Sequence, residues 1–162
     1  GWLAEHAHSV IAMDFSAGML ARARTRVSAT NVRWLAHDMN SAWPIADEFV
    51  DIVCFDLVLA HVHNLAAVFT EAARVLRSGG RMRLSELHPL RQQRGGQAHF
   101  TDDGSGATTM IPAFLHSIDE YLEAATAAAM RVIETGAGRD DDAPGDVEPR
   151  TFTAIFERRY TS

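Results

Sequence analysis

The stretch VIAMDFSAGML, residues 10–20, joins a buried strand to a helix. Its first four residues are apolar and end at Asp14, a pattern typical of a strand covered on both faces. Ser16 can cap the helix that follows, which we expect to run from Ala17 to about Val27 because apolar residues recur there at helical spacing. A strand that passes at once into a helix is typical of α/β folds.

The same alternation continues on both sides of this stretch. Trp2 and the residues after it look like the later part of another helix. We predict further strands at 32–36, 50–59, 81–87, 130–135 and 151–160, and further helices at 65–76 and 118–129. This order predicts a single α/β domain over residues 1–162. The irregular segment 89–117 is expected to be a lid or insertion over the substrate.

Composition and charge narrow the class of protein. The 162 residues are 47% apolar and 22% charged, and the net charge of −6 argues against a nucleic-acid surface. No apolar run has the length of a membrane span and no secretory signal opens the chain, so we expect a cytoplasmic protein without a membrane partner. The single cysteine, Cys54, lies in an apolar run and is expected to be a buried thiol.

Four segments, taken in order, resemble the class I S-adenosylmethionine-dependent methyltransferase family. They are residues 10–20, the tripeptide His37-Asp38-Met39, residues 52–64, and the run EAARVLRSGG at 71–80. The resemblance implies a Rossmann-like, doubly wound sheet that is mostly parallel and has an antiparallel last strand. It also implies S-adenosylmethionine as cofactor and transfer of its methyl group to a small-molecule acceptor.

The resemblance implies a cofactor site at the ends of the first two predicted strands. Open α/β sheets bind ligands beyond the carboxyl ends of their strands, where Asp14 could accept hydrogen bonds from both ribose hydroxyls. Phe15 and Ser16 follow it, and Phe15 would pack on the adenine. Asp38 would accept a hydrogen bond from the adenine amino group, with Met39 against the ring. The alternatives are that Asp14 only caps the next helix and that Asp38 only forms a turn.

Further along, the resemblance places the methyl donor and the acceptor near the next two strand ends. Asp56 is expected on the cofactor side, mainly through its backbone. Glu86, His88 and His116 are predicted substrate-side residues, and imidazoles near neutrality make His88, His116 and His61 candidate bases. The alternatives are exposed loop histidines, and a core histidine for His61. We expect no metal site.

The family's first strand and its glycine-rich loop have no counterpart in this sequence, which begins at Gly1. Loss of that strand would expose two strand edges or force them to pair. We expect a fragment of a longer product first, then a degenerate homologue, then a chain whose homodimer or other partner supplies the strand. A non-catalytic methyltransferase-like module is the alternative function, and a nicotinamide-dependent oxidoreductase fits the motifs less well.

Overall fold

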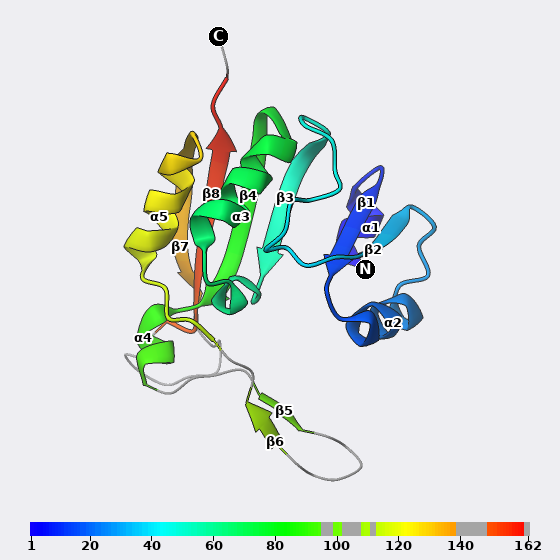
Figure 1. The fold of residues 1–162 in the computed structure, drawn as a ribbon, viewed down its shortest axis with the longest axis horizontal. Coiled ribbons are helices and arrows are strands. Elements are labelled where there is room, and N and C mark those ends of the chain that lie inside the picture. The colour runs from blue at the N-terminus through cyan, green and yellow to red at the C-terminus, as the bar shows by residue number, and fades with distance from the viewer. Residues whose placement is uncertain (95–98, 102–107, 111–112, 139–148, 161–162) are drawn as a thin grey trace. The chain divides into compact units, whose positions relative to one another are not determined.

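The fold is that of a computed structural model, which describes the structure of residues 1–94, 99–101, 108–110, 113–138 and 149–160. The chain divides into two compact units, Gly1–Pro44 and Ile45–Ser162. Each unit contains both helices and strands (Figure 1). Among the described helices, none combines the length and the apolar character needed to cross a membrane.

The first unit is a strand-helix-strand unit preceded by a short helix. Helix α1 (Trp2–His6) leads into β1 (Val10–Asp14), α2 (Ala17–Arg26) and β2 (Val32–Ala36). Strands β1 and β2 are parallel, in a register that runs from Val10 opposite Val32 to Asp14 opposite Ala36. The side chain of Asn31 donates to the carbonyls of Ala4 and Ala7, which ties α1 to the start of β2. Parallel pairing brings both carboxyl ends to one edge.

The second unit is a four-stranded mixed sheet in the order β3-β4-β8-β7. Its strands are β3 (Val50–Asp56), β4 (Leu76–Leu87), β7 (Met130–Gly138) and β8 (Thr151–Arg158). Strands β3 and β4 are parallel, whereas β8 lies between β4 and β7 and is antiparallel to both. The predicted α/β fold class, with parallel pairs and an antiparallel last strand, is therefore confirmed.

Helices α3 (Leu65–Val75) and α5 (Ile118–Ala127) lie side by side over one face of this sheet (Figure 1). The residues that meet under them are fully buried and mostly apolar, among them Phe69, Met82, Leu84, Tyr121 and Phe156. Burying such side chains contributes roughly 1.5–3 kcal/mol each, which holds the helices on the sheet. The remaining described elements are η1 (Leu59–His61), α4 (Pro89–Gln93), β5 (His99–Thr101) and β6 (Thr108–Met110).

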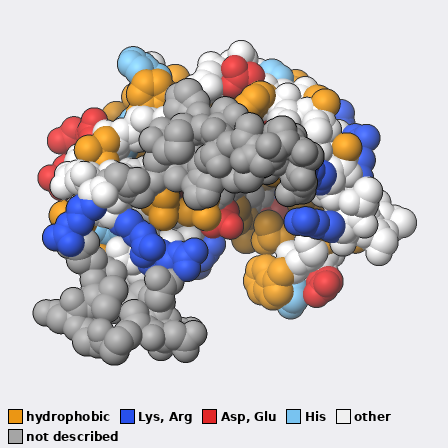
Figure 2. All heavy atoms as spheres, turned by 90° about the horizontal axis from the view of Figure 1, so that it is seen from below, with side chains coloured by type: hydrophobic (Ala, Val, Ile, Leu, Met, Phe, Trp, Pro, Cys, Tyr) orange, Lys and Arg blue, Asp and Glu red, His pale blue; other side chains and the backbone are white. Residues whose placement is uncertain are grey.

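The other face of the sheet carries charged side chains. The carboxylate of Glu157 on β8 forms ion pairs with Arg131 of β7 at 2.6 Å and with Arg81 of β4 at 3.7 Å. Three neighbouring strands therefore share one ion-pair network. Figure 2 shows basic, acidic and apolar side chains of the described residues reaching the surface together on the face that it draws.

The structure corrects the prediction for Cys54. Strand side chains alternate between faces, and Phe55 points under α3 while Cys54 and the 60%-exposed Ile52 lie on the opposite face. Cys54 is therefore exposed, not buried. The prediction of a buried thiol rested on the apolar run around Cys54, but only one face of β3 is buried.

Several predicted boundaries also move. The strand predicted at 50–59 ends at Asp56, and α3 ends at Val75. Strand β4 begins directly after α3, at Leu76, five residues earlier than expected. Gly79, with φ of 75°, therefore lies within β4. In the described ladders β1 pairs with β2, and β3 pairs with β4. Within 89–117, residues 95–98, 102–107 and 111–112 lie outside the described part, and the lid stays a prediction.

Candidate functional site

The first group of predicted site residues lies where β1 and β2 end. The amide of His37 donates to the carbonyl of Asp14 at 3.1 Å, which extends the parallel pairing to the last residue of β1. Asp38 follows one residue later. Asp14 and Asp38 thus lie at the same edge of the same pair of strands, as the sequence predicts.

Asp14 forms the turn that starts α2. Its Oδ1 accepts the amide of Ser16 at 2.7 Å, and the hydroxyl of Ser16 accepts the amide of Met19 at 3.3 Å. Ser16, not Asp14, is therefore the N-cap residue, so the alternative that Asp14 caps the helix is wrong in detail. One carboxylate oxygen of Asp14 is used in the turn, and a carboxylate has further acceptor capacity for ligand hydroxyls.

Asp38 also shapes its own turn. Its Oδ1 accepts both the backbone amide of Asn40 at 2.9 Å and the side-chain amide at 2.8 Å. These hydrogen bonds hold the pKa of Asp38 below its ordinary value because they favour the charged form. The carboxylate is exposed and stays ionised at neutral pH. Asp38 thus forms a turn, and the same group is still able to accept from a ligand.

Apolar side chains stand beside these two acids. Phe15 is 75% exposed, and Met19 on the first turn of α2 is also exposed. Met39 is half-buried, and its carbonyl accepts the indole N–H of the buried Trp43 at 3.0 Å. An exposed aromatic ring next to a hydrogen-bonding acid is a suitable combination for an aromatic ligand with hydroxyl groups.

The second group of predicted residues surrounds the turn after β3, in the second unit. Asp56 is exposed at the end of β3, and Leu57 then adopts φ of 52°, a left-handed conformation that is costly for a side chain of this type. The next two amides, of Val58 and Leu59, each donate to Oε1 of Glu86 at 2.9 Å. Glu86 lies on β4, so the end of the neighbouring strand holds the turn.

Glu86 is only 1% exposed. Burial raises the pKa of its carboxyl, and the negative charge of Asp56 raises it further, whereas the turn amides oppose both effects. Its Oε2 is buried and has no hydrogen-bond partner among the described residues. Tyr121 of α5 also lies near Glu86, and burial raises the pKa of that phenol.

The predicted histidines are not exposed loop residues. His88 and His116 are 9% and 7% exposed, so that alternative is wrong for both. Nε2 of His116 lies 2.7 Å from the carbonyl of Val62. A carbonyl only accepts, so Nε2 carries the hydrogen and Nδ1 of the neutral ring is the acceptor. His88 caps α4, with Nδ1 accepting the amide of Leu90 at 3.4 Å, and His61 is half-buried at the end of η1.

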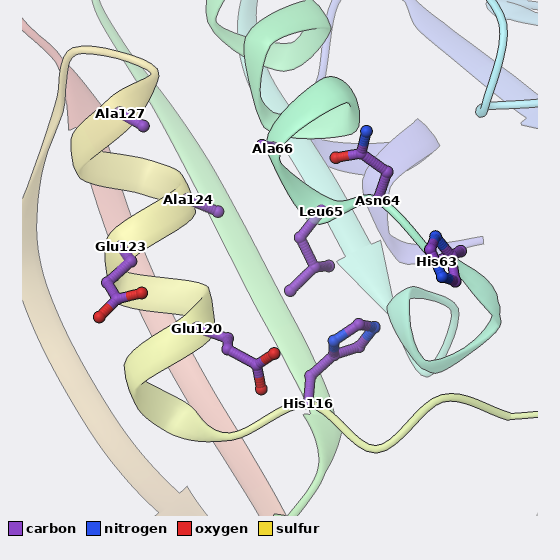
Figure 3. Close-up of a pocket in the computed structure, with 9 residues that line it drawn as sticks. All are labelled: His63, Asn64, Leu65, Ala66, His116, Glu120, Glu123, Ala124 and Ala127. Carbon is purple, nitrogen blue, oxygen red and sulfur yellow. The ribbon is translucent and has the colours of Figure 1, made fainter.

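A pocket of about 460 Å³ lies between the start of α3 and helix α5 (Figure 3). Several of its polar groups already have structural partners. Glu120 and Ser117 form a capping box at the start of α5, Asn64 caps α3, and His116 binds Val62. Figure 3 shows Glu123 turned away from the two histidines of the pocket. His116 thus lines the pocket, but few of the other lining groups are free to recognise a polar ligand.

Two features of the site had no signal in the sequence. Leu57 occupies a left-handed position that usually takes Gly, Asn or Asp, so its residue type gives no warning. The contact between Glu86 and the turn joins residues 27 and 28 positions apart. Glu86 has the same parity as the apolar Met82 and Leu84 in a strand that alternates polar and apolar residues, and this was the only available hint that its side chain is buried.

A family model described as a methyltransferase domain matches residues 1–84, which include both strand ends with Asp14 and Asp38 and the turn after β3. The chain belongs to the class I S-adenosylmethionine-dependent methyltransferase family. S-Adenosylmethionine is the cofactor of this family. A putative S-adenosylmethionine-dependent methyltransferase from Listeria monocytogenes has the same fold, with a TM-score of 0.80, 16% identity, and coverage of 98% of this chain and 84% of that one.

Two named methyltransferases are similar to this chain in sequence. The demethylmenaquinone methyltransferase of Corynebacterium efficiens is 30% identical over 125 residues, which cover 77% of this chain and 44% of that protein. The malonyl-[acyl-carrier protein] O-methyltransferase of Yersinia pestis is 36% identical over 101 residues, covering 57% and 37%. The chain spans less than half the length of these relatives.

Proposed function

We propose that this chain takes part in methyl transfer from S-adenosylmethionine to a small-molecule acceptor. The observation that carries the proposal is the pair of acidic residues, Asp14 and Asp38, at the carboxyl ends of two neighbouring parallel strands in a member of this family. That edge is where open α/β sheets bind their ligands.

The residues of the first unit fit the nucleoside half of the cofactor by the chemistry of their donors and acceptors. Asp14 would accept from the ribose hydroxyls, Phe15 and Met39 would contact the adenine ring, and Asp38 would accept from its amino group. Ser16 fixes Asp14 through the turn, and Asp56 stays a predicted cofactor residue. When bound, the cofactor supplies a methyl group already activated by the positive sulfonium.

The chain's own task in the reaction is then to orient the acceptor and, for a hydroxyl acceptor, to remove its proton. Among the predicted bases His116 is favoured, because its Nε2 is fixed on the Val62 carbonyl and its Nδ1 is left as the acceptor. In His88 the nitrogen Nδ1 already accepts the amide of Leu90, so that ring is better suited to orientation. Glu86, His88 and His61 remain predicted site residues.

The relatives suggest which acceptors to try. Proteins similar to this chain are a demethylmenaquinone methyltransferase and a malonyl-[acyl-carrier protein] O-methyltransferase. We therefore propose a quinone-type ring or an acyl carboxylate as the first acceptor classes. A cytoplasmic location, a single domain over residues 1–162, a lid at 89–117, and a homodimer or strand-supplying partner remain predictions of the sequence.

The test is transfer of labelled methyl from S-adenosylmethionine to a hydroquinone analogue and to a malonyl thioester, with the wild-type chain, His116→Gln and the control His8→Gln. We expect label in one acceptor and no change in the control. In His116→Gln we expect a fall of about 10²–10⁴-fold with the hydroquinone, whose hydroxyl must lose its proton, and no such fall with the carboxylate, which has none to lose. His8 is exposed and lies in the first unit. Absence of label in both acceptors, with a folded chain, would favour the non-catalytic module.

A further inference from the structure

The turn that follows β3 is strained and yet held in place from two sides. Leu57 has φ of 52°, and its amide donates to the carbonyl of Ser85 at 2.8 Å. On the other side, the amide of Phe114 donates to the carbonyl of Ala60 at 2.7 Å. A non-glycine residue in a left-handed conformation persists only where its surroundings fix it, and such positions cluster at functional sites.

Glu86 makes the contacts that complete this turn. Its Oε1 accepts the amides of Val58 and Leu59, both at 2.9 Å, immediately after the strained residue. Without that oxygen both amides would lose this acceptor, and for the amide of the buried Leu59 the cost is about 1–3 kcal/mol. The carboxyl also lies on β4 beside the end of β3, so it links the turn to the rigid sheet.

The residues at the two ends of this turn are among the predicted site residues of the second unit. Asp56 precedes Leu57, and His61 ends the short helix that starts at Leu59. Any movement of the turn would therefore move both residues. The carboxyl of Glu86 is 1% exposed, so in this structure it acts on a ligand only through the turn.

We propose that Glu86 is a positioning residue that fixes the turn 57–60 and thereby places Asp56 and His61 for cofactor and acceptor. The proposal rests on the proposed function and adds a role for a buried side chain that would not touch either ligand. A shorter acidic side chain would withdraw the carboxyl by about 1.5 Å, one carbon–carbon bond, and would break both contacts while keeping the charge.

The experiment compares wild type, Glu86→Asp, Glu86→Gln and the control Glu134→Asp, an exposed residue of β7. Amide hydrogen exchange is followed at Val58 and Leu59, and binding of S-adenosylhomocysteine is measured by calorimetry. In Glu86→Asp we expect exchange at these two amides to rise at least about tenfold while α3 and β8 stay protected. The dissociation constant of S-adenosylhomocysteine should rise by about tenfold or more.

Glu86→Gln keeps an oxygen acceptor in the same place, so it should retain slow exchange at both amides and bind within about threefold of wild type. The control should match wild type in both measurements. If the wild-type chain binds S-adenosylhomocysteine and Glu86→Asp binds it equally well, the positioning role alone is overturned. The same holds if exchange at Val58 and Leu59 is unchanged in Glu86→Asp. Failure of the wild-type chain to bind S-adenosylhomocysteine would instead overturn the proposed function, and with it this role.

Discussion

Among single residues, Leu57 has an unusual backbone conformation for its type. A left-handed residue with a side chain costs roughly 1–2 kcal/mol, and Asn tolerates this conformation better than Leu. We expect Leu57→Asn to be about 1 kcal/mol more favourable for folding than the matched substitution Leu115→Asn. The two leucines are 52% and 51% exposed, but only Leu57 has positive φ.

Urea unfolding of both variants measures this difference in the free energy of unfolding. Leu57→Val, with a branched β-carbon, should destabilise the chain instead, by about 1 kcal/mol. Equal effects of the two asparagine substitutions would show that Leu57 is not strained in solution.

The buried carboxyl of Glu86 should make the stability of the chain depend on pH. Burial raises the pKa of its carboxyl in the folded chain above the ordinary value of 4.5. The folded chain therefore holds a proton that the unfolded chain has already lost, and the associated stability, present below about pH 4.5, is lost as pH rises through the folded pKa. Glu86→Gln has no such proton.

The free energy of unfolding of wild type minus that of Glu86→Gln should thus fall as pH rises above about 4.5, by at most about 1.4 kcal/mol per pH unit. Urea titrations at several pH values from 4 to 8 measure the difference, in which most other carboxylates cancel. A difference that grows with pH would mean that the folded chain favours the charged form, contrary to this account.

At the scale of elements, helix α5 depends on its first residue. The hydroxyl of Ser117 accepts the amide of Glu120 at 3.1 Å, and the amide of Ser117 donates to the Glu120 carboxylate at 2.7 Å. Loss of such a cap costs about 0.5–2 kcal/mol. We expect Ser117→Ala to lower the melting temperature, while Thr126→Ala, inside the same helix and exposed, should not.

Thermal unfolding followed by circular dichroism compares the two alanine variants. Equal melting temperatures for both variants would remove Ser117 from the set of residues that hold α5.

On the scale of the whole molecule, the order of strands and helices could be predicted from sequence because the hydrophobic periodicity is strong in each element. Strand 32–36 and the starts of α2, α3 and α5 were predicted at their observed residues. Ends were harder to predict, because the apolar run after Val50 continues past Asp56 into η1 and only the left-handed Leu57 stops the strand.

Burial and long-range contacts could not be predicted in the same way. Cys54 shows the limit on burial: a nearly continuous apolar run does not say whether one face of a strand or both are covered. The short helix α4 and the β5–β6 pair were missed in a segment without periodicity. The acidic strand ends were predicted from the family resemblance, but the hold of Glu86 on the turn depends on tertiary structure.

The most direct test of the account is a calorimetric titration of the chain with S-adenosylhomocysteine, beside Asp14→Asn and the control Asp119→Asn. An asparagine oxygen still accepts the Ser16 amide, so the turn survives while one acceptor for ribose is lost. The account predicts binding by wild type and by the control, weakened at least about tenfold in Asp14→Asn, or roughly 1.4 kcal/mol. No binding by the folded wild-type chain, or equal binding by all three, would contradict it.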